Sequence, residues 1–303
     1  MLTLTFLGTS AARPTVERSV SAIALEREGE TLLFDCGEGT QRQMMRYGVG
    51  FSLSHIFFTH FHADHYLGVP GLIRTFGLQG RTEKLTLYGP RGADRVLGAA
   101  VELGFDRWPF QVEVCEVKAG DVFARDDYAI EVVRADHGGP AVGYALREAE
   151  RLGRFDPEKA RALGVPEGPL WGKLHKGETV EVEGRPITSK DLVGPPRPGR
   201  LVVISGDTAP CKEMIVAAKG ADLLVHEATF GDEEKERAVE TKHSTARQAA
   251  EVARAAGVKR LVLTHLSARY SVATEGLLAE AQEVFPETVV ARDGMVVEVP
   301  FSG

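Results

Sequence analysis

The sequence has few of the features that a secreted or membrane-embedded protein needs. It contains three widely separated cysteines among 303 residues, Cys36, Cys115 and Cys211. An odd number of scattered cysteines does not suit a disulfide framework, so we expect free thiols and a cytoplasmic location. No apolar run approaches the length of a membrane span, and we expect no membrane association. The opening MLTLTFLGTS has no basic residue ahead of its apolar residues, which predicts no signal peptide.

An excess of positive charge is also missing. The sequence contains 36 Lys and Arg and 43 Asp and Glu, which gives a formal net charge of −7. This balance alone argues weakly against a nucleic-acid partner. However, aspartates that bind metal count as negative, whereas bound cations are left out of the sum. Local patches of charge therefore decide more than the total.

Short runs of apolar residues bounded by glycine and proline predict two sheet-forming halves. The first half contains LTLTFLG, SAIALERE, TLLFDCG, HIFFTH and KLTLYGP, and the second contains RLVVIS, ADLLVHEAT, RLVLTHLS and VVEVP. Within the first half we expect a mixed, largely antiparallel sheet. The clearest helix runs from Ser244 to Ala256, where Thr245 and Gln248 have capping-box spacing and Gly257 ends it. We expect one α/β domain over residues 1–303, a four-layer αββα sandwich.

Residues 149–200 interrupt this pattern with pieces rich in glycine and proline, GVPEGPLWGKLHKGE and VGPPRPGR. Such a stretch resists burial in a sheet and predicts an excursion from the core. A disordered linker is the alternative, but Leu170, Trp171 and Leu174 make the segment too apolar for a pure spacer. We therefore predict an ordered or conditionally ordered arm.

One seven-residue segment, THFHADH at residues 59–65, holds three histidines and one aspartate. It follows the strand-like LSHIFF, so it lies where a strand ends, a usual place for a site in an α/β fold. His60 and His62 point to one side of an extended backbone and can bind one metal. Asp64 and His65 are adjacent, which favours a second metal. Imidazole and carboxylate suit zinc, manganese or iron. The alternative is a histidine-rich polar loop that binds no metal.

Three later apolar runs end in ligand-type residues, at His137, Asp207 and His265. A polar residue at a strand end often only meets solvent, but three of them together with the first cluster favour a metal site. The ligands then divide into two sets that Asp207 bridges: His60, His62 and His137, and Asp64, His65 and His265. Asp35, in LLFDCGEG, either braces a ligand histidine or forms a turn.

With these residues the chain resembles the metallo-β-lactamase superfamily, whose signature is His-x-His-x-Asp-His followed by later His, Asp and His ligands. The resemblance covers nearly the whole length and implies a dinuclear hydrolase of this fold. It does not imply a substrate. HEAT at residues 226–229, HST at 243–245, the Gly-Pro-bearing insertion and the opening GTSAARPTVERS together resemble the ribonuclease Z family. That family trims the 3′ trailer from precursor tRNA.

The resemblance implies two Zn²⁺ ions per chain, with Mn²⁺ as an alternative, that activate water to attack the phosphodiester. The expected products are a 3′-hydroxyl on the tRNA and a 5′-phosphate on the trailer. Asp64 is the expected proton acceptor, His243 the general acid and Glu227 the residue that orients it. The alternatives are that His226 and Glu227 only brace ligands and that His243 only caps the helix. A small-molecule or cyclic phosphodiesterase remains the alternative function.

The insertion, residues 147–177, resembles the tRNA-binding arm of that family. Lys173, His175 and Lys176 lie beside its Gly-Pro turn, where cations and backbone amides can meet phosphates. Arg18, in the opening loop, is a further candidate for contact with RNA. The resemblance also implies a homodimer in which one subunit's arm holds the tRNA that the other cuts. A small phosphodiester would have no use for such an arm.

Overall fold

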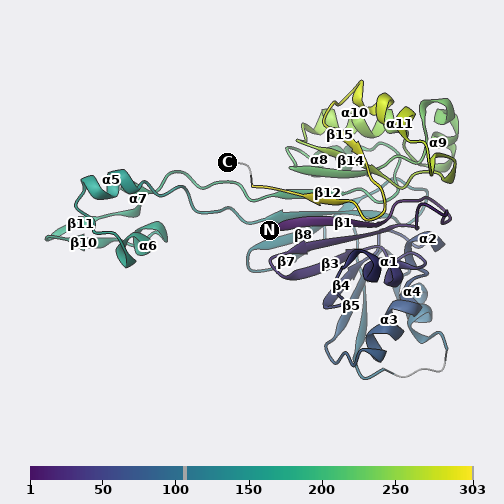
Figure 1. Cartoon of the computed structure of the whole chain (residues 1–303), viewed down its shortest axis with the longest axis horizontal. Coiled ribbons are helices and arrows are strands. Elements are labelled where there is room, and N and C mark those ends of the chain that lie inside the picture. Colours follow the sequence, from purple (N-terminus) through teal and green to yellow (C-terminus); the bar gives the residue numbers. More distant parts are fainter. Residues whose placement is uncertain (105–107, 302–303) are drawn as a thin grey trace.

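Two seven-stranded sheets packed face to face form the body of the protein, and a long arm projects from it (Figure 1). The structure is a computed structural model, and it describes residues 1–104 and 108–301. Helices cover the outer faces of both sheets, so the layers run helix, sheet, sheet, helix. This is the predicted four-layer sandwich.

The first sheet has the order β16-β1-β2-β3-β4-β5-β6. Its strands are β1 (Leu2–Gly8), β2 (Ala22–Arg27), β3 (Glu30–Phe34), β4 (Leu53–Phe57), β5 (Leu85–Gly89), β6 (Val112–Glu116) and β16 (Val296–Glu298). Its outer face packs against α1 (Thr40–Tyr47), α3 (Val69–Leu78) and α4 (Ala93–Glu102). The C-terminal strand thus closes the sheet that the N-terminal strand begins.

The second sheet has the order β15-β14-β13-β12-β9-β8-β7. Its strands are β7 (Val122–Ala124), β8 (Tyr128–Arg134), β9 (Val142–Glu148), β12 (Leu201–Ile204), β13 (Leu223–Glu227), β14 (Leu261–Thr264) and β15 (Thr288–Val290). Its outer face packs against α8 (Lys212–Ala217), α10 (Ala246–Ala256) and α11 (Glu275–Gln282).

Both sheets are mixed, as the sequence predicts for the first one. The expectation that the first sheet is largely antiparallel is wrong. Among the described residues, each sheet has three antiparallel and three parallel neighbouring pairs. The parallel pairs occur where a helix separates consecutive strands, because a crossover returns the chain in the same direction. Short apolar runs do not distinguish the two cases. The carboxyl ends of β4, β8, β12, β13 and β14 consequently share one edge of the sandwich.

Helix α10 forms as its sequence predicts. Thr245 caps its N-terminus in a capping box with Gln248, and Gly257 ends it in the left-handed conformation, with φ of 64°. Its small apolar residues are buried against the second sheet. Because Thr245 supplies the cap, the position of His243, two residues earlier, is fixed by the helix that follows.

The arm is inserted between β9 and β12, which are antiparallel neighbours. It contains α5 (Pro157–Ala162), α6 (Pro169–His175), β10 (Val180–Val182), β11 (Arg185–Ile187) and α7 (Ser189–Leu192). Its own small core consists of Ala160, Val165, Leu174, Val180, Ile187 and Leu192. Two extended connections join this unit to the body (Figure 1). The arm is ordered and lies within the excursion predicted for residues 149–200. The narrower insertion predicted for residues 147–177 covers only the first part of the arm.

A buried ion-pair network holds the two ends of the arm together at the body. Glu148 ends β9, and its carboxylate accepts two short bonds from the Arg200 guanidinium, at 2.7 Å each, and one from Arg27 Nε at 2.8 Å. Arg200 Nη1 also donates to the carbonyl of Val299 at 3.0 Å. Because Glu148 and Arg200 stand where the chain leaves and returns, the network closes the root of the arm.

Within the described residues, no helix is long and apolar enough to cross a membrane. The three cysteines are free thiols.

Candidate metal centre and active site

The ligand candidates converge at the edge where strands of both sheets end. His60 and His62 follow β4, His137 follows β8, Asp207 follows β12 and His265 follows β14. Asp64 and His65 lie in the short helix α2 (Ala63–Tyr66), which begins directly after His62. All seven side chains lie at this one edge, although they come from positions up to 205 residues apart in the sequence.

Their ligand atoms form two adjoining groups, within each of which the atoms lie within 4.8 Å of one another. One group contains His60, His62, His137 and Asp207, and the other contains Asp64, His65 and His265. Asp207 and His265 also form a third such group with His243. Asp207 stands between them: its Oδ2 is 3.5 Å from His60 Nε2, and its Oδ1 is 3.3 Å from His265 Nε2. The side chains group as the sequence predicts, and their role as metal ligands stays a prediction.

The chemistry of these atoms fits divalent cations. His60 Nε2 and Asp207 Oδ1 are buried and have no hydrogen-bond partner among the described residues, which is costly unless something else satisfies them. Burial, helped by the neighbouring charge of His65, holds the pKa of His60 well below its usual value, so its imidazole is neutral and can ligate. The two groups can therefore hold metal ions.

His65 carries an extra proton that a bound cation would replace. Burial opposes its charged form, but Asp207 and Asp35 outweigh burial and hold the pKa of His65 well above its usual value. A metal ion bound beside Asp207 would take the place of this proton, because ligation requires the neutral ring.

Residues behind the ligands fix their orientation. His65 Nδ1 donates to Asp35 Oδ2 at 2.7 Å, and Asp35 also accepts from the Thr59 backbone N–H at 2.8 Å. Asp35 itself has φ of 57°, in the left-handed region, so it forms the turn and braces the ligand at once. His137 Nδ1 donates to the carbonyl of Lys242 at 3.0 Å. Both rings are thereby held with Nε2 toward the cluster.

Gly206 allows β12 to bring Asp207 close to β4. A Cβ at this position would lie 2.7 Å from the Cβ of Thr59 and 2.9 Å from the carbonyl oxygen of Val142, closer than real side chains approach. Its φ of 61° is also unfavourable for other residues. A glycine at this position therefore permits the close approach of the two strand ends.

His243 and Glu227 form a second constellation at the same edge. His243 Nδ1 lies 2.7 Å from Glu227 Oε1, and its ring is 5.6 Å from that of His265, centre to centre. Burial opposes the imidazolium, but the charge and hydrogen bond of Glu227 outweigh it and raise the pKa of His243 to about 9. Thr208 N–H and Thr229 N–H fix Glu227 by donating to its two carboxylate oxygens. Since Thr245 caps α10, His243 is free of the capping role.

His226 points away from this constellation. Successive side chains of β13 alternate between the faces of the sheet, so His226 shares the helix-covered face with Leu224, while Glu227 faces the ligands. Its Nδ1 donates to the carbonyl of Glu227 at 2.7 Å, and no ligand residue is among its hydrogen-bond partners. The described contacts give it no part in orienting a metal ligand.

A cleft of about 440 Å³ opens onto these groups and is named here the His243 cleft. Its lining includes His62, Asp64, Asp207, His243 and His265. The opening loop of the chain supplies a further wall, where the Ala12 backbone N–H donates to Asp64 Oδ2 at 2.7 Å. Four of the predicted ligands, among them the predicted proton acceptor Asp64, therefore share one solvent-accessible space with the predicted proton donor His243.

Arg18 lies beneath this loop and is 7% exposed. Its guanidinium donates to Thr9 Oγ1 at 2.7 Å, to the carbonyl of Ala291 at 2.7 Å and to the carbonyl of Ser271 at 3.0 Å. These bonds fasten the loop to the C-terminal part of the chain. Contact between Arg18 and RNA stays a prediction, and the structure gives the side chain a bracing position.

Of the residues predicted to bind RNA in the arm, two are exposed and one is half-buried. Lys173 and Lys176 are exposed on α6 and just after it. His175 is half-buried, donates from Nε2 to the carbonyl of Gly153 at 2.9 Å and packs against Phe155. The two lysines are accessible to a phosphate backbone, whereas His175 ties α6 to the incoming connection.

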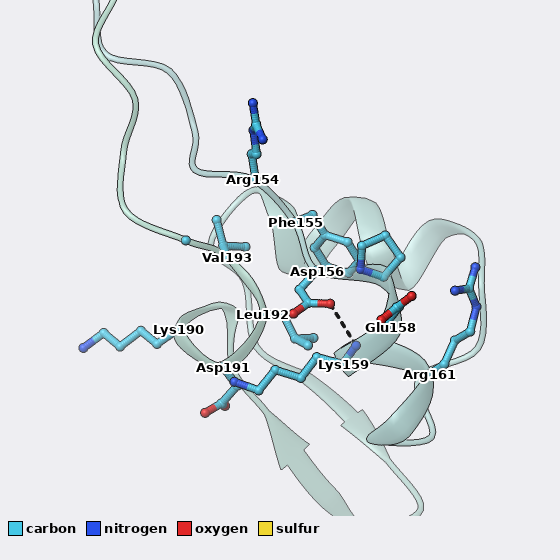
Figure 2. Close-up of a pocket in the computed structure, with 12 residues that line it drawn as sticks. Arg154, Phe155, Asp156, Glu158, Lys159, Arg161, Lys190, Asp191, Leu192 and Val193 are labelled. Atoms are coloured by element: carbon cyan, nitrogen blue, oxygen red, sulfur yellow. Dashed lines mark hydrogen bonds between the residues drawn. The ribbon is translucent and has the colours of Figure 1, made fainter. Parts of the chain in front are cut away.

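The arm also carries cations that the sequence interpretation missed. A cleft of about 770 Å³ is lined by residues before and within α5 and by residues of α7 (Figure 2). Asp156 and Asp191 on its wall cap the two helices, whereas Arg154 and Lys190 extend away from the ribbon. Lys190 comes from the second part of the arm, beyond residue 177. ITSKDLVG gave no signal for such a cation, because Arg154 and Lys190 line one cleft only when the arm folds.

The chain is similar to known proteins over its full length. Residues 15–265 match the family model described as the metallo-beta-lactamase superfamily. A protein named ribonuclease Z from Gemmatimonas aurantiaca is 59% identical over 98% of this chain and 96% of its own length. Another of the same name, from Myxococcus xanthus, is 57% identical over 99% of this chain and 98% of its own length.

Among solved structures, the short form of human tRNase Z is similar with a TM-score of 0.72 and 30% identity. The match covers 99% of this chain and 100% of that one. The metallo-β-lactamase fold protein YhfI from Bacillus subtilis, with a TM-score of 0.70 and 18% identity, shares the fold.

Proposed function

This chain belongs to the metallo-β-lactamase superfamily and, within it, to the ribonuclease Z family, and from this premise we propose that it is a zinc-dependent endoribonuclease that removes the 3′ trailer from precursor tRNA. The products are a tRNA with a 3′-hydroxyl and a trailer with a 5′-phosphate. The observation that carries the proposal is the His243 cleft, in which a Glu-supported histidine faces the same space as two adjoining ligand groups.

The ligand groups suit two Zn²⁺ ions per chain, with Mn²⁺ as the alternative, because they offer only imidazole and carboxylate donors. Two such ions, when bound, acidify water and neutralise the charge that builds on the phosphodiester. Asp207, between the two groups, would be shared. Asp64, whose pKa is lowered by its hydrogen bond to His265 and the nearby imidazole charges despite burial, stays ionised and can accept the proton of the attacking water.

His243 supplies the proton for the leaving group. Expulsion of a ribose 3′ oxygen requires a proton, since an alkoxide is a poor leaving group, and an imidazolium in the cleft can donate it. Glu227 orients the ring through Nδ1, which leaves Nε2 to face substrate. The bonds from Thr208 and Thr229 keep the Glu227 carboxylate in place, so the donor is positioned before substrate arrives.

The topology supports a homodimer that acts on a large RNA. β9 runs antiparallel to β8 and β12, so the arm leaves the edge opposite to the one that carries the ligands. Figure 1 accordingly shows the arm extending away from α2. An arm so placed cannot fold over its own active site, but a two-fold partner can present it to the other subunit's cleft. We propose that the arm binds the folded tRNA backbone through Lys173 and Lys176, with Arg154 and Lys190 as additional cations.

The direct test is incubation of the zinc-loaded protein with a precursor tRNA that carries a 3′ extension. The expected result is a single cut with a 3′-hydroxyl on the tRNA and a 5′-phosphate on the trailer, and metal analysis should give two ions per chain. A 3′-phosphate or 2′,3′-cyclic end would contradict the mechanism. Cleavage of a cyclic nucleotide with no cleavage of the precursor would favour the small phosphodiesterase. A cytoplasmic location stays a prediction from the free cysteines.

A further inference from the structure

A second cleft reaches the ligand groups from the other side of His62. It measures about 510 Å³, and we name it the Arg91 cleft. The His243 cleft and the Arg91 cleft share His62 in their linings, so the two spaces meet at the metal centre. The Arg91 cleft contains His60 and His137 from the ligand groups but neither His243 nor Asp64.

The two clefts differ in charge. Arg91 and Arg95, at the start of α4, line the Arg91 cleft, and no carboxylate of the described residues lines it. Both arginines are exposed, and neither has an ion-pair partner among the described residues. The opposite wall is Gly138, Gly139 and Pro140, which offers a close approach without long side chains. The His243 cleft, in contrast, contains two carboxylates, Asp64 and Asp207, and one arginine, Arg237.

The direction of the reaction assigns an occupant to each cleft. Under the proposed function, the leaving atom is the 3′ oxygen of the tRNA, and its proton comes from His243. The last nucleotide of the tRNA must then lie in the His243 cleft. The scissile phosphate stays attached to the trailer through its 5′ oxygen, and the chain of the trailer must continue away from His243. The space that remains open on that side is the Arg91 cleft.

We propose that the Arg91 cleft binds the first nucleotides of the trailer and that Arg91 and Arg95 contact the phosphates that follow the scissile one. The inference rests on the proposed function. A single-stranded RNA requires cations along its backbone and a flat apolar surface for a base, and the half-buried ring of Phe61 lines the same cleft. The scissile phosphate itself belongs to the metal centre. The arginines therefore act on trailers longer than one nucleotide.

Trailer length gives the test. Zinc-loaded wild-type protein and the double variant Arg91→Ala/Arg95→Ala are compared on one precursor tRNA with a one-nucleotide or a six-nucleotide trailer. A one-nucleotide trailer has no phosphate beyond the scissile one. We expect the double variant to lose roughly tenfold in kcat/KM on the long trailer and less than about twofold on the short one. The matched control is Arg42→Ala/Arg46→Ala, an exposed arginine pair on α1 that lines neither cleft.

Uncharged methylphosphonate linkages at the second and third trailer positions provide an independent test. They should slow wild type on the long trailer and leave the double variant unchanged, because the contact is already lost. Equal losses on both trailers, or an effect of the neutral linkages that persists in the double variant, would overturn the inference. Wild-type protein that cuts neither precursor would instead overturn the proposed function.

Discussion

The edge that carries the ligand groups and the arm that leaves the opposite edge use polar side chains in different ways. At the ligand edge, His60, His65 and Asp207 are almost fully buried, and residues behind the ligands, such as Asp35, hold them in place. In the arm, Lys173 and Lys176 stand in solvent around a core of a few small apolar residues. Bond-making chemistry needs groups fixed to fractions of an ångström, whereas recognition of an RNA backbone needs accessible charge. The two regions should therefore fail differently when changed.

The largest effect is expected at the ligand edge, from Asp64→Ala. This change removes a ligand candidate and the proposed proton acceptor together. We expect a loss of about 10⁴-fold in kcat on precursor tRNA and on bis(p-nitrophenyl) phosphate alike, because both need the metal centre. Metal content should fall below two ions per chain. Asp64→Asn, which keeps the shape, should retain more metal than Asp64→Ala; full activity in either variant would contradict the assignment.

His243→Ala should separate the two substrates within the same cleft. Precursor tRNA should be cleaved about 10² to 10⁴-fold more slowly, because the 3′ oxygen loses its proton donor. Bis(p-nitrophenyl) phosphate should be affected much less, since p-nitrophenolate leaves without a proton. Both metal ions should stay bound. Equal losses on both substrates would show that His243 acts on the metal centre instead.

Glu227→Gln provides the matched pH test of the same pair. A general acid works only while protonated, so activity on precursor tRNA is lost as pH rises through the pKa of His243. Glu227 raises that pKa to about 9 against the effect of burial. Its replacement by glutamine should move the alkaline limb of the kcat profile to lower pH. An unmoved limb would assign that limb to another group.

The junction between the two regions is tested by Glu148→Gln. The variant leaves the buried guanidinium of Arg200 without its carboxylate and removes one of the two carboxylates that pair with Arg27, which keeps Asp127. We expect a loss of about 3–5 kcal/mol in the free energy of unfolding. Burial opposes ionisation of Glu148, but its bonds to Arg200 and Arg27 lower its pKa. The difference in the free energy of unfolding between wild type and variant is thus complete above about pH 4.3, the ordinary pKa of glutamate. It is lost as the pH falls through the lower pKa that Glu148 has in the folded protein. Denaturant titrations at pH 7 and pH 3 measure it.

Excision of the arm should break recognition and leave the chemistry intact. Because β9 and β12 pair directly, a short Gly-Ser turn can replace residues 152–196 and keep Glu148 and Arg200. We expect kcat/KM on precursor tRNA to fall roughly 10²-fold, with a flatter salt dependence, as phosphate contacts are lost. Hydrolysis of bis(p-nitrophenyl) phosphate should stay within about twofold of wild type. Unchanged tRNA cleavage would make the arm a passive loop.

The smallest effect is expected from Lys173→Ala/Lys176→Ala. Loss of two phosphate contacts should lower the salt slope of log kcat/KM by about two units, with a few-fold loss at low salt. Lys118→Ala/Lys219→Ala, on exposed positions of the body, is the control and should change neither quantity. If the slope is unchanged while Arg154→Ala/Lys190→Ala lowers it, the α5–α7 face of the arm is the one that binds RNA.

Much of the candidate metal centre could be predicted from the sequence because its signals are local. Two-residue spacing in THFHADH predicted that His60 and His62 act together, and the structure places their rings 4.6 Å apart, centre to centre. The capping box at Thr245 was equally local and is present. Polar residues at the ends of apolar runs predicted Asp207 and His265, since strands that share an edge bring their ends together.

Other features were decided by the tertiary structure. Arg18 could not be told from an exposed arginine, because its acceptors on Thr9, Ser271 and Ala291 meet only when the termini pack together. His226 and Glu227 are neighbours in sequence, and the orientation of β13 alone decides which of them faces the cleft. The Arg91 cleft joins α4 to a loop that follows β8. Spacing along the chain determines which side chains can act together locally, whereas burial, partners and clefts arise from contacts between distant segments.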